Sequence, residues 1–188
     1  MKQKLVLIGA STGGPGHLKK ILQALPLTYR AGIVIAQHMN STFIPSFITQ
    51  FQHEIALPVE ALNAQTTLLS GHIYICAHHT QLFCERSRLE ATISEEGMTP
   101  YHPSIDTLFS SALNCFEGAD ILAVLLTGIG YDGAQGLSDL HIKGASCIAE
   151  SEKSAIVYGM PKRALEINPN IDAKALEDII LSIVKFGA

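Results

Sequence analysis

Apolar residues fall into short continuous runs along the chain, and each run is followed by a polar or glycine-rich turn. The first run is residues 5–8, the second lies within 31–37, and the most apolar one is 121–126. Runs that are continuous rather than alternating are typical of strands buried on both faces of a parallel sheet. We therefore expect buried strands at these places, and a further strand at 145–149.

Segments with helical spacing separate these runs. In one of them Phe43, Phe47 and Phe51 recur four residues apart, which indicates one buried stripe of a helix. Ser104 precedes another such segment and is a natural helix cap. Strands that alternate with helices predict an α/β fold with a doubly wound, mostly parallel sheet and helices on both faces. The helices are expected at 17–25, 43–52, 105–116, from the turn at 133 to about 142, after Pro161, and over 172–186.

Residues 68–93 have a different pattern of polar and apolar positions. Short runs of alternating polar and apolar residues at 72–77, 81–85 and 89–93 are separated by polar turns. Alternation of this kind is typical of antiparallel hairpins with one solvated face. We therefore expect an antiparallel hairpin on the edge of the parallel sheet.

Three buried strands end at residues with complementary chemistry, namely Ser11, His38 and Asp132. In an open α/β sheet, ligands bind at the carboxyl ends of the strands, so these side chains are expected at one edge. A serine nucleophile needs a base within hydrogen-bond reach and a third group that orients the base. Residues 9–13 also fit the G-x-S-x-G turn that exposes a nucleophilic serine. We interpret Ser11, His38 and Asp132 as a catalytic triad.

Each of the three residues also has a plain structural interpretation. Ser11 can be a turn or capping residue, His38 a hydrogen-bonded structural histidine, and Asp132 a cap of the helix that follows it. The chain order of serine, histidine and aspartate also differs from the order in α/β-hydrolases. The joint placement of all three at strand ends favours the triad.

Two other ligand sites are conceivable from the sequence. Residues 128–133 satisfy G-x-G-x-x-G between a strand and a helix, and Glu150 ends the next strand, as in a dinucleotide-binding site. Asp132 argues against this site, because its carboxylate would lie near the pyrophosphate. Imidazole and thiolate groups in the hairpin region are possible zinc ligands, although their spacing matches no standard zinc pattern. These groups are His72, Cys76, His78, His79 and Cys84. We expect neither a cofactor nor a metal.

Length and composition restrict the function further. A chain of 188 residues with 47% hydrophobic and 16% charged residues is expected to form one compact domain over 1–188. Its net charge is −4 and it has no basic run, which argues against nucleic acid as a partner. No apolar run reaches the length of a membrane span or a signal peptide, so we expect a cytoplasmic protein without membrane insertion. Its four scattered cysteines are expected to be reduced core residues.

Six motifs in this order give the chain a specific resemblance. It resembles the catalytic domain of the chemotaxis protein-glutamate methylesterase family, CheB, over nearly its whole length. The motifs are IGASTGGP at 8–15, QHM at 37–39, FIPSF at 43–47, HPSIDTLFSSA at 102–112, LLTGIGYDGAQGL at 125–137 and YGMP at 158–161.

The resemblance implies a triad of Ser11, His38 and Asp132, and an oxyanion site formed by donors around Thr12 and by the backbone N–H of Ile129. The implied substrate is a glutamyl methyl ester on the cytoplasmic helices of methyl-accepting chemotaxis receptors. The implied products are glutamate and methanol, and members of the family also deamidate receptor glutamines. A binding module that holds receptor helices without turnover is the alternative from another functional class.

The sequence departs from the family pattern at several positions. Ile129 replaces a usual Met, His102 a usual Arg, and Glu150 a usual Gln, while Ala77 and Gln81 replace a usual Pro and His. These changes leave the implied triad intact and bear on substrate contacts and partner specificity. No receiver domain precedes the match in this sequence, so we expect no control by phosphorylation within it.

Overall fold

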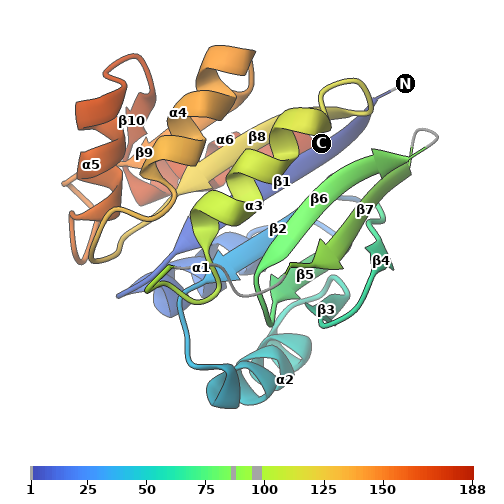
Figure 1. The fold of residues 1–188 in the computed structure, drawn as a ribbon. Helices are drawn as coiled ribbons and strands as arrows, with labels where there is room; N and C mark the ends of the chain where they lie inside the picture. The colour runs from blue at the N-terminus through green and yellow to red at the C-terminus, as the bar shows by residue number, and fades with distance from the viewer. Residues whose placement is uncertain (1, 86–87, 95–98) are drawn as a thin grey trace.

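The computed structural model describes residues 2–85, 88–94 and 99–188. Its centre is a seven-stranded sheet in the order β10-β9-β8-β1-β2-β5-β3 (Figure 1). Every neighbouring pair in this sheet is parallel, which confirms the predicted mostly parallel α/β fold. The strands are β1 Gln3–Ala10, β2 Gly32–Gln37, β3 Val59–Leu62, β5 Ile73–Cys76, β8 Ala119–Leu125, β9 Ser146–Glu150 and β10 Asp172–Lys174.

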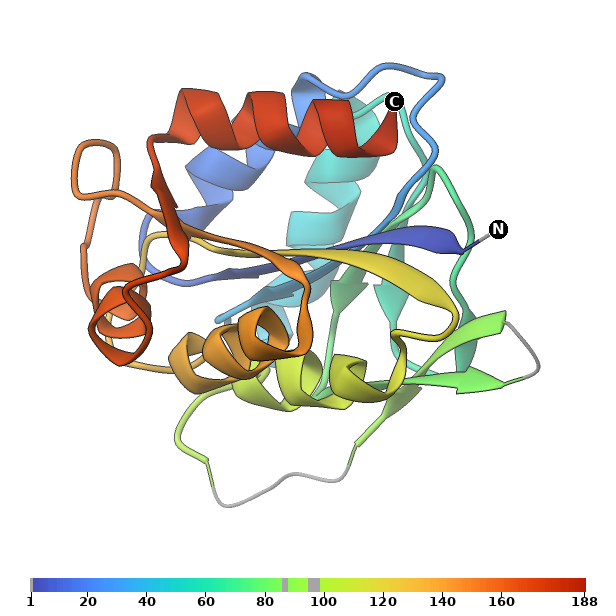
Figure 2. The same ribbon diagram turned by 90° about the horizontal axis from the view of Figure 1, so that it is seen from above.

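Helices cover both faces of the sheet (Figure 2). One face packs against α1 Gly14–Gln23, α2 Ile44–Glu54 and α6 Leu176–Gly187, and the other against α3 Ile105–Ser111, α4 Ala134–Lys143 and α5 Met160–Ile167. Each face has its own hydrophobic cluster, because the central strands bury side chains on both sides. None of the helices in the described residues is long and apolar enough to cross a bilayer.

A second, three-stranded antiparallel sheet contains β4 Thr66–Thr67, β6 Thr80–Glu85 and β7 Arg88–Ile93 in the order β4-β7-β6. The hairpin predicted at 81–93 is therefore confirmed, but it forms a sheet of its own and is not an edge of the parallel sheet. The prediction for 72–77 was wrong, because β5 lies inside the parallel sheet between β2 and β3. All four residues of β5 are buried, as an interior parallel strand requires.

The largest differences from the predicted helix limits are in α1, α3 and α6. Helix α1 begins three residues earlier than predicted, because Gly13 has a left-handed φ of 84° and Pro15 lies in the first turn. Helix α3 ends at Ser111 and continues as the 3₁₀ turn Ala112–Asn114. The segment predicted as one helix over 172–186 is the short strand β10 followed by α6.

The predicted phenylalanine stripe of α2 is only partly present. Phe47 and Phe51 are buried and their rings meet edge to face at 4.5 Å, whereas Phe43 is 62% exposed. Phe43 belongs to the 3₁₀ turn Ser41–Phe43, which turns its side chain away from the core.

Strand register places the three central strand ends at one level. Ala10 in β1 pairs with Gln37 in β2, and Gly9 in β1 pairs with Leu125 in β8. The chain therefore leaves β1, β2 and β8 side by side at the carboxyl edge of the sheet. Ser11 and His38 lie at this edge, and the 126–133 loop starts there.

Candidate active site

Ser11 lies in the tight turn between β1 and α1. Its backbone N–H donates to Thr127 O at 3.0 Å, and its carbonyl accepts from Gly14 N at 2.8 Å. Glycine is required at position 13, because φ there is positive and an added Cβ would lie 2.7 Å from Ile156 Cβ. The backbone on both sides of the serine is therefore fixed by neighbouring loops.

His38 follows β2 and is held beside this turn. Its backbone N–H donates to Ala10 O at 2.9 Å. The buried Gln37 side chain joins the two residues, because its Nε2 donates to Ser11 O and to His38 O, each at 3.0 Å. Gln37 therefore ties the end of β1 to the end of β2.

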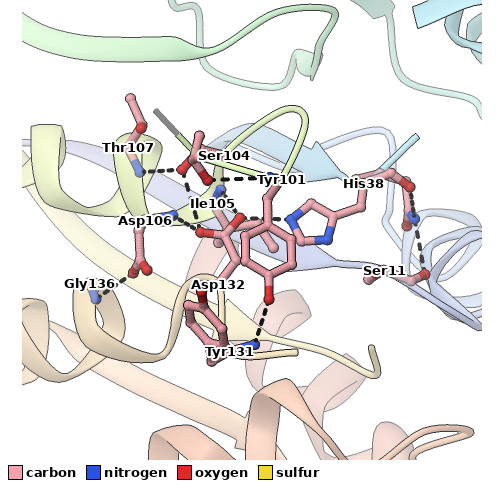
Figure 3. Close-up of polar contacts among 12 residues, drawn as sticks. Ser11, His38, Tyr101, Ser104, Ile105, Asp106, Thr107, Tyr131, Asp132 and Gly136 are labelled. Atoms are coloured by element: carbon pink, nitrogen blue, oxygen red, sulfur yellow. Dashed lines mark hydrogen bonds and ion pairs between the residues drawn. The ribbon is translucent and has the colours of Figure 1, made fainter. Parts of the chain in front are cut away.

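Asp132 accepts a 2.7 Å hydrogen bond from His38 Nε2 (Figure 3). The same carboxylate accepts from the backbone N–H groups of Ile105 at 2.7 Å and Asp106 at 2.9 Å, and from Ser104 Oγ at 3.4 Å. Its interpretation as a cap of the following helix is wrong, since Gly133 occupies the N-cap of α4. Asp132 instead binds the N-terminus of α3, an element distant in sequence.

Burial by itself raises the pKa of Asp132, since only 2% of the residue is exposed. The hydrogen bonds from His38 and from the amides of Asp106 and Ile105 outweigh burial, and the pKa lies below its ordinary value of 3.8. An ionised carboxylate only accepts hydrogen bonds, so His38 Nε2 carries the proton in this contact. The Nδ1 lone pair of neutral His38 is then the basic site.

One tyrosine covers a face of the histidine, and a second tyrosine packs against the first. The Tyr101 ring stacks on the His38 ring with centroids 5.0 Å apart and planes within 12°. Tyr131 meets Tyr101 edge to face at 5.3 Å, and the Tyr131 N–H donates to the Tyr101 hydroxyl at 3.4 Å (Figure 3). Gly130, with a positive φ, makes room for this hydroxyl, which would lie 2.3 Å from an added Cβ. One face of His38 is thus covered by an aromatic side chain.

The structure brings Ser11, His38 and Asp132 to the same edge of the sheet, and it connects the last two directly. Among the described residues, no hydrogen bond joins the Ser11 hydroxyl to His38. The 127–129 segment passes directly beside Ser11, because an added Cβ on Gly128 would lie 2.5 Å from Ser11 Cβ. Thr12 is exposed, and its carbonyl accepts from Thr127 Oγ1 at 2.9 Å. The Ile129 side chain is 62% exposed at the rim.

The alternative dinucleotide site is not formed. Glu150 is fully buried, and its carboxylate accepts hydrogen bonds from Ser154 Oγ at 2.7 Å and Thr127 N at 2.8 Å. A buried and bonded carboxylate is unable to reach a ribose hydroxyl at the surface.

The groups considered as zinc ligands have other partners. His72 Nδ1 bonds Glu60 Oε1 at 2.7 Å, and His79 Nδ1 accepts from Ser104 N at 2.9 Å. Burial raises the pKa of the Cys76 thiol to about 12, which disfavours the thiolate that zinc requires. Within the described ranges, no three histidine, cysteine or acidic side chains converge as a metal site, and all four cysteines are free.

Two site residues were missed by the sequence reasoning. Gln37 is the one amide in the otherwise apolar run 31–37, and a polar residue ending a buried strand is a usable signal. Tyr101 is the other. Nothing in its neighbours indicates that its ring covers His38, because the contact joins segments more than sixty residues apart.

The lowered pKa of Asp132 predicts how stability depends on pH. Its ionised form is favoured in the folded state, so this stabilisation is complete above the unfolded pKa near 3.8 and is lost as the pH falls through the lower folded pKa. The difference in unfolding free energy between wild type and Asp132→Asn should therefore shrink as the pH falls from 5 toward about 2. Denaturant titrations of both proteins across this range measure it. A difference that stays constant would contradict the lowered pKa.

Comparisons with known proteins agree with this geometry. Residues 6–183 match the family model described as CheB methylesterase. A protein-glutamate methylesterase/protein-glutamine glutaminase 3 of Pseudomonas aeruginosa is 36% identical over 178 residues, covering 95% of this chain and 53% of the relative. A protein-glutamate methylesterase/protein-glutamine glutaminase 2 of Carboxydothermus hydrogenoformans is 40% identical over 170 residues, covering 87% and 48%. The chain spans about half the length of the curated relatives it matches.

A solved structure agrees with the fold. The crystal structure of the Thermotoga maritima CheB methylesterase catalytic domain superposes with a TM-score of 0.89 at 26% identity, covering 98% of this chain and 99% of that one. With the family model matching nearly all of the sequence, the chain belongs to the CheB methylesterase family.

Proposed function

We propose that residues 1–188 form a methylesterase catalytic domain that hydrolyses glutamate γ-methyl esters on methyl-accepting chemotaxis receptors to glutamate and methanol. Deamidation of receptor glutamines is the second reaction, in which ammonia leaves in place of methanol. The observation that carries this proposal is the bonded His38–Asp132 pair beside Ser11 in a chain of the CheB methylesterase family. The site of action is the cytoplasm, where the receptor helices lie.

The arrangement supports a two-step acyl-transfer mechanism. Ser11 Oγ attacks the ester carbonyl while His38 Nδ1 takes its proton, and the resulting imidazolium returns that proton to the departing methanol. Asp132 holds the proton on Nε2, so that the Nδ1 lone pair is available, and stabilises the imidazolium. Water, deprotonated by His38, then attacks the acyl-serine and releases glutamate.

The tetrahedral intermediate needs hydrogen-bond donors for its oxyanion. The segment that follows Thr127 passes beside Ser11, which supports the backbone N–H of Ile129 and donors around Thr12 in this role. A single such donor contributes about 3 kcal/mol to transition-state stabilisation. A main-chain donor does not depend on the Ile129 side chain, so the usual Met is not needed for it.

Methanol release from methylated receptor membranes tests the function directly. We expect release that grows with time and enzyme, matched by conversion of methylated receptor peptides to free glutamate in mass spectrometry. Receptor binding without methanol release would overturn the proposal in favour of a binding module. Turnover of small esters with no action on receptor peptides would keep the esterase chemistry and overturn the substrate.

Tyr101→Ala is expected to lower kcat roughly 10- to 100-fold with a smaller change in KM, because His38 loses the ring that fixes its orientation. Tyr101→Phe keeps the stacked ring and loses only the long bond from the Tyr131 N–H, so its kcat should stay close to wild type. Steady-state methanol release measures both variants. Equal losses in the two would show that the hydroxyl, and not the stacking, matters.

A further inference from the structure

A second histidine–carboxylate pair contacts Thr127, next to the candidate active site. His17 in α1 is 6% exposed and Glu150 at the end of β9 is fully buried. His17 Nδ1 lies 3.2 Å from Glu150 Oε1 and 3.3 Å from Oε2. Buried carboxylates are costly unless they are fully hydrogen-bonded, so this pair needs a reason.

Glu150 joins three separate parts of the chain. Besides His17, its oxygens accept from Ser154 Oγ at 2.7 Å and from the Thr127 backbone N–H at 2.8 Å. Ser154 Oγ in turn accepts from Leu176 N at 2.9 Å, at the start of α6. The carboxylate is therefore the common acceptor for α1, the loop after β9 and the loop after β8.

One residue, Thr127, connects this carboxylate to the serine. Its backbone carbonyl accepts from Ser11 N at 3.0 Å, and its hydroxyl donates to Thr12 O at 2.9 Å. Thr127 is completely buried, so neither contact is replaced readily by water. A shift of Thr127 therefore moves the Ser11 turn and the start of the 128–133 loop together.

We propose that His17 and Glu150 are a positioning pair that fixes Thr127, and through it sets the Ser11 turn against the loop that ends at Asp132. The pair touches no reacting atom, and its role in turnover rests on the proposed function. His17 supplies an N–H to the buried carboxylate, and the carboxylate supplies the acceptor for the Thr127 amide.

Two variants separate the carboxylate charge at position 150 from the hydrogen-bond acceptor that this side chain offers to Thr127. His17→Ala leaves the buried Glu150 carboxylate without one of its hydrogen-bond partners, so we expect kcat for methanol release to fall roughly 10- to 100-fold with KM changed less. Adding Glu150→Gln to His17→Ala should restore most of the kcat, because an amide carries no buried charge and its oxygen still accepts from Thr127 N. Lys19→Ala is the matched control on the same helix, since its ion pair with Glu54 is partly exposed and involves neither Glu150 nor Thr127, and it should retain wild-type kcat.

Hydrogen exchange at the Ser11 amide, measured by NMR, reports the turn without any substrate. His17→Ala should accelerate exchange at Ser11 relative to the Val34 amide in β2, and the double variant should reverse this. Unchanged exchange and kcat in folded His17→Ala would overturn the proposal, as would a double variant no better than the single one. If the wild-type protein were inactive on receptors while the exchange pattern was as expected, the proposed function would be overturned. The positioning pair would still stand.

Discussion

Replacing Ser11 with Ala is expected to lower kcat for methanol release roughly 10⁶-fold, to the background of the blank reaction. The change removes one oxygen atom that makes no hydrogen bond to His38 in the described structure, and the turn is held by backbone contacts of Ser11 that alanine keeps. Receptor binding and the free energy of unfolding should therefore remain close to wild type. Methanol release, receptor pull-down and denaturant titration measure these three quantities.

Ser70→Ala is the control for this variant, because Ser70 is exposed in the turn before β5, at the opposite edge of the sheet from the site. It should retain full activity. Substantial turnover by Ser11→Ala would remove Ser11 from the nucleophile role and leave water, activated by His38, as the attacking group. A loss of stability in Ser11→Ala would instead assign the residue to the turn.

The placement of the candidate site at one sheet edge could be predicted from the sequence, because this placement depends mainly on the topology of the sheet. Continuous apolar runs indicate parallel strands, and right-handed crossovers bring the carboxyl ends of such strands to one edge. Any polar residues that follow those runs are then neighbours. Ser11, His38 and Asp132 needed no knowledge of side-chain conformation to be placed together.

Features that depend on contacts between distant segments could not be predicted in this way. All four residues of β5 are apolar, but so short a run beside alternating segments does not reveal that its burial comes from parallel pairing with β2 and β3. Glu150 was considered as a ribose ligand because of its spacing. Its true surroundings are set by His17, 133 positions away in sequence. Local patterns specify elements, whereas the polar partners of buried groups come from packing.

Asp132 connects the candidate site to the fold, since the same carboxylate binds His38 and the N-terminus of α3. Four donors converge on its two oxygens, and three of them come from residues 104–106. A negative charge is also favoured at a helix N-terminus, where backbone N–H groups are unpaired. The orientation of His38 is therefore fixed by a group that α3 itself holds in place.

Asp132→Asn is expected to lower kcat about 10⁴-fold with little change in KM, which is the size of effect seen when a triad aspartate is made neutral. The Asn oxygen at the Oδ1 position still accepts from the Asp106 amide, so α3 keeps one backbone partner, whereas the Ile105 amide shares the Oδ2 position with His38 and loses its acceptor. Its NH₂ group then faces His38 Nε2 and donates to it, which moves the imidazole proton to Nδ1 and removes the lone pair that Ser11 needs. Steady-state methanol release measures kcat and KM, and imidazole ¹⁵N shifts report the tautomer.

Asp139→Asn on α4 is the matched control, because within the described part of the chain that carboxylate accepts from the Gln135 side chain in a solvent-exposed contact and is no part of the site, so kcat should be unchanged. Asp132→Ala separates the two roles further: it should lose both kcat and stability, since the α3 amides lose their acceptor. If Asp132→Asn kept kcat within about tenfold of wild type while Asp132→Ala was strongly destabilised, Asp132 would be a cap of α3 alone. A tautomer shift together with the full loss of kcat would instead assign His38 Nδ1 as the base that activates Ser11.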